Sequence, residues 1–201
     1  MRPIKKYKKI IKSPNKKIAF VCITLTALAL LGAAAFYLFF LKDLPSPTKL
    51  STSTGSLSTQ IYDRNNQLLY TIYTNRNQTF TPLEKIPKTL QQATIAIEDK
   101  NFYKHGAIDL RGITRAAYLT LFHKQIQGGS TITQQLVKNG LLTQERTLTR
   151  KIKELTLSIV VEFMYSKDKI LEMYLNQVPY GGTAYGVEAA SATYFGKPVK
   201  S

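Results

Sequence analysis

A run of uncharged, mostly apolar residues near the amino terminus constrains this chain more than any other feature. The run extends from Ile18 to Leu41 and contains no charged side chain. A helix of this length would cover about 36 Å at about 1.5 Å per residue, which is enough to cross the hydrocarbon core of a bilayer with some tilt. The sequence therefore predicts a transmembrane helix at residues 18–41.

The residues on either side of this run indicate its orientation. Residues 1–17 contain eight basic side chains and no acidic one, and basic flanks stay on the cytoplasmic side of a membrane. The run ends in FYLFFLKD, which lacks the small residues of a signal-peptide cleavage site. We therefore expect a single-pass protein of the cytoplasmic membrane, with a basic cytoplasmic tail at 1–17, a signal anchor at 18–41 and an extracytoplasmic remainder. The alternative is a cleaved signal peptide.

The charge of the chain narrows the choice of partners. The formal net charge is +16, and half of it lies in residues 1–17. Such a balance suits nucleic acid, an anionic membrane or a phosphorylated substrate. The basic cluster lies on the predicted cytoplasmic side of the anchor and contains one aromatic residue, Tyr7. We therefore expect a membrane partner and no nucleic acid.

Cysteine and histidine provide no metal site. Cys22 is the only cysteine, so the chain can form neither an intramolecular disulfide nor a cysteine-based metal centre. His105 and His123 are 18 residues apart and lack the spacing of zinc ligands. The sequence therefore assigns no metal ligand.

The remainder of the chain divides into a linker and a folded region. Residues 42–60 are rich in Ser, Thr and Pro, which predicts an extended linker. The domain that follows, at 61–201, opens with alternating apolar residues over 61–74 that predict a short hairpin. Apolar residues at helical spacing then predict five helices, near residues 87–99, 110–123, 131–138, 148–163 and 167–176. The expected fold class is therefore mostly α with one small β element near its start.

The fourth of these helices has the clearest apolar stripe. Its members are Leu148, Ile152, Leu155, Ile159 and Phe163, which step by four, three, four and four residues. Such a stripe is typical of the buried face of an amphipathic helix.

Two groups of charged residues allow more than one interpretation. Glu98 and Asp99 end the first predicted helix, where the macrodipole disfavours negative charge, so they form either a solvated helix end or a functional pair. Glu154 follows Arg146, Arg150 and Lys151 at spacings that place all four near one helix face. That pattern is typical of an exposed, salt-bridged face.

The segment GGSTITQQLVKN, residues 128–139, is unusually polar for a helix in the middle of a folded region. Its first part can be a loop with Ser130 or Thr131 as the helix N-cap. A helix N-terminus flanked by hydroxyls and by Lys138 is also suited to bind an anion.

Four segments in this order resemble a known family. They are EDKNFYKHGAIDLRGITRA, GGSTITQQLVKN, RTLTRKIKE and KDKILEMYLNQVPYGGTAYGVEAASATYFGK. Together they resemble the peptidoglycan glycosyltransferase domain, glycosyltransferase family fifty-one, of class A penicillin-binding proteins and monofunctional transglycosylases. The resemblance runs from about Ile61 to Lys200. It implies a mostly α, lysozyme-like fold and the polymerisation of lipid II, a disaccharide-pentapeptide carried on undecaprenyl pyrophosphate.

The resemblance also implies roles for individual residues. Glu98 matches the general base, which takes the proton of the acceptor 4-hydroxyl as that oxygen attacks C1 of the donor sugar with inversion. Asp99 matches the acidic residue beside the base, and Glu154 matches the second essential glutamate. The residues that match the donor site are Ser130, Thr131, Gln134 and Gln135. Lys138 and Arg146 match the residues that hold the pyrophosphate, and Arg150 and Lys151 match the neighbours of Glu154. Tyr174 and Asn176 match a motif that supports the cleft.

The resemblance leaves some questions open. Glu154 can act as an acid, position the pyrophosphate or bind a divalent cation. The cation, Mg or Mn, is the one cofactor that the sequence leaves open. The expected partners are lipid II, the growing glycan strand, the membrane and other cell-wall synthesis proteins.

The chain departs from the family pattern at two points. Ala107 stands where the family usually has glycine, and the sequence ends at Ser201, where the family's domain continues, so we expect a domain incomplete at its carboxyl end. The alternatives to an active polymerase are an inactive, membrane-anchored module that binds lipid II and a lytic transglycosylase that cleaves glycan strands.

Overall fold

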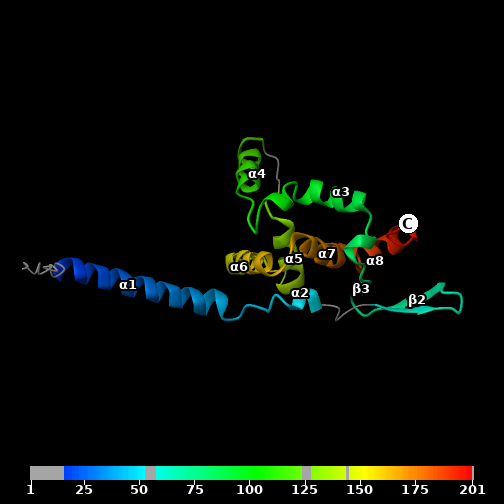
Figure 1. The fold of residues 1–201 in the computed structure, drawn as a ribbon, viewed down its shortest axis with the longest axis horizontal. Coiled ribbons are helices and arrows are strands. Elements are labelled where there is room, and N and C mark those ends of the chain that lie inside the picture. Colours follow the sequence, from blue (N-terminus) through cyan, green and yellow to red (C-terminus); the bar gives the residue numbers. More distant parts are fainter. Residues whose placement is uncertain (1–15, 53–57, 124–127, 144, 201) are drawn as a thin grey trace, which may run out of the picture. The chain divides into compact units, whose positions relative to one another are not determined.

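The computed structural model describes residues 16–52, 58–123, 128–143 and 145–200 (Figure 1). The chain forms two compact units, Met1–Asp43 and Leu44–Ser201, and each is described by itself. Most of the basic tail predicted at 1–17, and residues 53–57 of the predicted linker, lie outside the described residues.

The first unit is a single helical element. Helix α1 (Lys16–Phe36) continues into one wider helical turn, η1 (Tyr37–Leu41). Alanine and leucine, which favour helices, dominate its sequence. Within the described residues, Lys16–Leu41 is long and apolar enough to cross a membrane by length and composition, and none of it is buried in the protein. The predicted helix at 18–41 is confirmed as a helix, while its insertion in a membrane stays a prediction.

The second unit is mostly helical, which confirms the predicted class. Its elements in chain order are α2 (Lys49–Thr52), β1 (Thr59–Tyr62), β2 (Leu68–Ile72), β3 (Asn77–Gln78), η2 (Leu83–Lys85), α3 (Lys88–Glu98), η3 (Phe102–Lys104), α4 (Leu110–His123), α5 (Ile132–Leu141), α6 (Leu148–Met164), α7 (Lys167–Gln177), β4 (Pro179–Gly181), β5 (Ala184–Tyr185) and α8 (Gly186–Phe195). All five predicted helices are present.

In the described part of the chain, the β structure consists of two small sheets. Strands β1 and β2 pair in antiparallel register, as the alternating pattern predicts, and Asp63 closes their turn by accepting hydrogen bonds from the amides of Asn65 and Gln67. The second sheet has the order β3-β5-β4 and pairs Asn77 with Ala184. The sequence pattern does not predict this sheet, because its strands have only two or three residues and β3 lies far from β4 and β5 in the chain.

Helix α5 lies at the centre of the second unit and packs against α6 and α7 (Figure 1). The core includes Ile132, Leu136 and Val137 from α5. The predicted linker at 42–60 is not extended throughout, since α2 places Leu50 in this core and Gln177 donates to its carbonyl oxygen. The polar segment singled out in the sequence is therefore the central helix of the fold.

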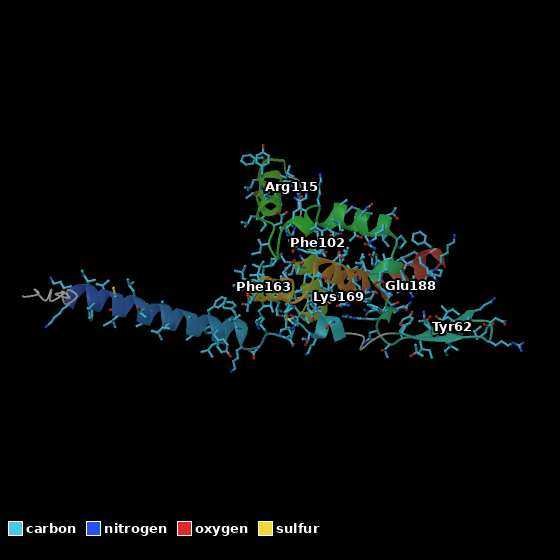
Figure 2. All side chains as sticks on the ribbon, in the orientation of Figure 1. Tyr62, Phe102, Arg115, Phe163, Lys169 and Glu188 are labelled. Atoms are coloured by element: carbon cyan, nitrogen blue, oxygen red, sulfur yellow. The ribbon has the colours of Figure 1, made fainter. Side chains whose placement is uncertain are left out.

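The buried face of α6 is not the one that its apolar stripe predicts. Leu148 and Phe163 are 85% and 88% exposed, whereas the buried residues of the helix are Glu154, Leu157, Ser158 and Val161. Figure 2 labels Phe163 on this helix. Periodicity correctly identifies the helix and its apolar stripe, but it cannot tell whether that stripe meets the core or the surroundings. Helix α4 exposes apolar side chains in the same way, among them Leu110, Leu121 and Phe122.

Candidate active site

Two adjacent carboxylates at the end of α3 have opposite environments. Asp99 is buried; its Oδ1 lies 2.7 Å from Nε2 of His105, and its Oδ2 accepts a hydrogen bond from the amide of Ile132 at 3.1 Å. Glu98 is exposed, and its Oε2 accepts from Nε2 of Gln135 at 2.8 Å. Asp99 therefore ties the end of α3 to the start of α5, while Glu98 stays open to an incoming molecule.

The start of α5 is fixed by side chains of the polar segment. Thr131 is the N-cap: its hydroxyl accepts from the amide of Gln134 and donates to the carbonyl of Ala107. The side-chain amide of Gln134 donates to the same carbonyl at 2.8 Å. Both side chains are buried, so the contacts that the structure gives them lie within the protein and shape the turn around Ala107. Their role as donor ligands stays a prediction.

Glu154 is an ion-paired residue, but it is not on an exposed face. It is 2% exposed, and its carboxylate pairs with Nη1 of Arg150 at 2.6 Å and with Nζ of Lys151. Lys151 also donates to Oε1 of Gln134 at 3.1 Å and lies 3.4 Å from Oγ of Ser130. The predicted ion pairs are therefore confirmed, whereas the prediction that Glu154 lies on an exposed face is wrong. A carboxylate this deeply buried requires such partners.

A cavity of about 450 Å³ opens beside these ion pairs. It is lined by Lys138, Thr143, Arg146, Thr147, Leu148, Arg150 and Lys151. Four of these residues are cations and none is acidic, so the cavity suits an anion with several oxygens. Helix α6 begins only at Leu148, with Thr147 as its N-cap, so Arg146 precedes the helix and does not share its face as the spacing suggests. Arg146 nevertheless lines the same cavity as Lys138.

A second and much smaller cavity, about 20 Å³, adjoins the exposed carboxylate. Glu98, Asp99, Asp109, Ser130 and Thr131 are among the residues that line it. Within the described part of the chain, Asp99, His105 and Asp109 have ligand atoms within 4.8 Å of one another. The two carboxylates are donors that suit Mg²⁺ or Mn²⁺, whereas the imidazole is more typical of other transition metals. The participation of a divalent cation stays a prediction.

Three residues near the site have contacts that spacing alone could not predict. His105, which lacks zinc-ligand spacing, is the partner of Asp99. The hydroxyl of Tyr174 donates to Oε1 of Gln135 at 3.2 Å, and burial together with the Glu98 carboxylate raises the pKa of Tyr174. The same two causes raise the pKa of Tyr180. No sequence signal links Tyr174 to Gln135, 39 residues earlier in the chain.

Asn176 supports the region behind the site. Its side-chain oxygen accepts from the amide of Thr81 at 2.7 Å, and its side-chain nitrogen donates to the carbonyl of Thr81 at 2.9 Å. Both atoms are buried, so this pair of bonds ties α7 to the segment that leads into α3. The contact agrees with the supporting role that the resemblance implies.

Known proteins match this chain along most of its length. Residues 65–201 match the transglycosylase family. Penicillin-binding protein 1A of Rickettsia bellii (strain RML369-C) is 43% identical over 192 residues, which cover 92% of this chain and 24% of that protein. The protein of the same name from Aquifex aeolicus (strain VF5) is 43% identical over 185 residues, with 92% and 25% covered. Penicillin-binding protein 1F of Bacillus subtilis (strain 168) is 41% identical over 192 residues, with 94% and 26% covered.

The chain spans about a quarter of the length of the curated relatives it matches. The family match nevertheless includes all the helices from α3 to α8 and every residue of the two cavities described above. This chain therefore belongs to the transglycosylase family.

Proposed function

We propose that the chain is a peptidoglycan glycosyltransferase that polymerises lipid II into glycan strands. One observation carries the proposal: a single helix, α5, contacts the exposed carboxylate of Glu98 and also lines the cationic cavity. Gln135 contacts Glu98, and Lys138, three residues later on the same helix, lines the cavity. Residues at this spacing share a helix face, with about 5–6 Å between their Cβ atoms. A sugar at Glu98 could therefore extend its pyrophosphate into the cavity.

The proposed reaction uses the two features together. Glu98 removes the proton from the 4-hydroxyl of the acceptor as that oxygen attacks C1 of the donor sugar. The bond from C1 to the pyrophosphate oxygen breaks, and its electron pair leaves with undecaprenyl pyrophosphate. Lys138 and Arg146 stabilise the charge that develops on this leaving group. Attack opposite the leaving group inverts C1, so an α-linked donor yields a β-linked strand.

The contacts of Glu154 support a positioning role among the three left open by the sequence. Its carboxylate faces Arg150 and Lys151, and it is not among the residues that line either described cavity near the site. Both oxygens of the carboxylate already accept hydrogen bonds from these two cations, so the contacts that the structure gives Glu154 are with side chains of its own helix. We infer that Glu154 holds Arg150 and Lys151 at the edge of the pyrophosphate cavity.

The exposed apolar surfaces suit a substrate that arrives in a bilayer. Helices α4 and α6 expose Leu121, Phe122 and Phe163, and side chains of this kind bind the boundary between headgroups and acyl chains. We propose that Lys16–Leu41 anchors the chain with its amino terminus in the cytoplasm and its second unit outside. The growing strand and other cell-wall synthesis proteins would be its partners there.

The test is a polymerisation assay with fluorescent lipid II and the detergent-solubilised chain, with products resolved on a gel. We expect a ladder of glycans that Glu98→Gln abolishes and that Glu84→Gln, the same change at an exposed glutamate in η2, leaves unchanged. Binding of lipid II without a ladder would indicate a non-catalytic module instead. Cleavage of preformed glycan would indicate a lytic transglycosylase, which has no pyrophosphate to bind.

A further inference from the structure

A chain of two hydrogen bonds leads from the core of the second unit to the exposed carboxylate. The hydroxyl of Tyr174, on α7, donates to Oε1 of Gln135, on α5, at 3.2 Å. Nε2 of Gln135 then donates to Oε2 of Glu98, at the end of α3, at 2.8 Å. Three helices therefore meet at one side-chain amide, and two of them, α5 and α7, pack against each other in the core.

The chemistry of the three groups allows only one direction for this chain. An ionised carboxylate can only accept hydrogen bonds, so the amide must turn its NH₂ group toward Glu98. Its oxygen then faces Tyr174, where only a protonated phenol can donate. Burial and the Glu98 carboxylate raise the pKa of Tyr174, so its proton is retained. The phenol therefore selects the amide orientation that serves the carboxylate.

Glu98 depends on this contact because its other surroundings give it little support. Gln135 provides the one hydrogen bond to its side chain among the described residues. Glu98 is also exposed and lies at the C-terminal end of α3, where the helix dipole disfavours a negative charge. Without the amide, its side chain could adopt several rotamers, of which only some direct the carboxylate to an acceptor hydroxyl.

We propose that Gln135 and Tyr174 are positioning residues for Glu98, with Tyr174 acting through Gln135. The inference rests on the proposed function for the role of Glu98 as the base. It differs from the donor-binding role that the resemblance implies for Gln135. Tyr174 is 3% exposed and so cannot bind substrate directly, which separates the two roles.

The first experiment compares Tyr174→Phe, Gln135→Met and the double variant in the polymerisation assay. Loss of one hydrogen bond to a charged group corresponds to about a tenfold change in rate. We expect kcat to fall about tenfold in each single variant, with KM for lipid II within about twofold of the wild type and no further fall in the double variant. Tyr165→Phe is the matched control, because its hydroxyl contacts Ser51 away from the site. An unchanged kcat in Tyr174→Phe, a rise in KM alone, or multiplying effects in the double variant would overturn the proposal.

The second experiment does not need activity, so it separates this inference from the proposed function. Glutamine side chains are labelled with ¹⁵N in the detergent-solubilised full chain, and the Gln135 amide signal is identified by its loss in Gln135→Met. We expect this signal to shift in both Tyr174→Phe and Glu98→Gln and to stay in place in Tyr165→Phe. If the signal does not shift in Tyr174→Phe or does not shift in Glu98→Gln, the two linked hydrogen bonds do not exist. If it shifts while the wild type makes no glycan, only the proposed function fails.

Discussion

Replacement of Glu154 by glutamine should destabilise the second unit as well as inactivate it. The substitution removes one negative charge and leaves two cations without their anionic partner, although Lys151 keeps its contact with Gln134. In the native protein the Glu154 side chain is 2% exposed, while those of Arg150 and Lys151 are 17% and 39% exposed. The substitution therefore removes the ion pairs between a fully buried anion and two cations that water partly reaches.

The magnitude follows from these exposures. Removal of one partner from a fully buried ion pair costs about 3–5 kcal/mol, mostly because the other charge stays buried and unpaired. Water can reach Lys151 and, to a lesser degree, Arg150, so we expect a smaller loss, about 2–3 kcal/mol. Nε of Arg150 is already buried without a hydrogen-bond partner among the described residues, so the guanidinium would become still less satisfied. For a domain of this size the loss corresponds to a fall in Tm of about 5–10 °C.

The assay is thermal unfolding of the detergent-solubilised chain, with Glu84→Gln as the matched control on an exposed glutamate. Lys151→Met combined with Glu154→Gln should recover part of the lost stability, because one unpaired cation is then gone. A Tm for Glu154→Gln equal to that of the control would refute the reasoning. Lys151→Met is also measured alone. If it lowers Tm by the same amount in the Glu154→Gln background as in the wild type, the two side chains are energetically independent and the reasoning is refuted.

Three further predictions follow from the structure. Lys138→Ala should lower kcat/KM for lipid II by about tenfold or more, because it removes a charged contact from the proposed pyrophosphate cavity, while Tm stays unchanged. Phe163→Ser should change the free energy of unfolding by no more than about 0.5 kcal/mol, whereas Val161→Ser, two residues away and fully buried, should cost about 3 kcal/mol; equal effects would contradict the assignment of the buried face. Burial and the Glu98 carboxylate raise the pKa of Tyr174 in the folded state. Its contribution to stability is therefore complete below about pH 10, the pKa in the unfolded chain, and is lost as the pH rises toward the folded-state pKa. Tm should fall less steeply above pH 10 in Tyr174→Phe than in the wild type.

Local sequence was sufficient to locate the five predicted helices, although a cap was predicted only for α5, as Ser130 or Thr131. The caps Thr131, Thr147 and Ser166 each accept a hydrogen bond from an amide three residues later, an interaction complete within one turn. The hairpin of β1 and β2 likewise depends on neighbouring residues and a short turn. Helix α8 is not predicted from the sequence, because its residues are rich in alanine and have no distinct polar and apolar faces that would reveal a helical period. The helix is recognisable only once its glycine start and its packing against α7 are known.

Local sequence was not sufficient to predict which face of a helix is buried. The apolar stripe of α6 begins at Leu148 and ends at Phe163, yet both of these side chains are exposed and the charged Glu154 is buried. A helical period shows that two faces differ, but the partner helix decides which face is covered. Here α5 covers the face that contains Glu154 and makes its burial tolerable by bringing Gln134 to Lys151.

The sequence by itself determined the length and apolar character of the first helix and the positions of the main helices, and its ordered motifs predicted the residues of the candidate site. Those properties follow from composition, local spacing and ordered motifs. Only the tertiary structure decided which of these residues touch: Glu98 with Gln135, Gln135 with Tyr174, and Asp99 with His105 and Ile132. The physical reason is that hydrogen bonds and burial depend on distances in space, and packing α5 against α6 and α7 brings together side chains that the chain itself keeps apart.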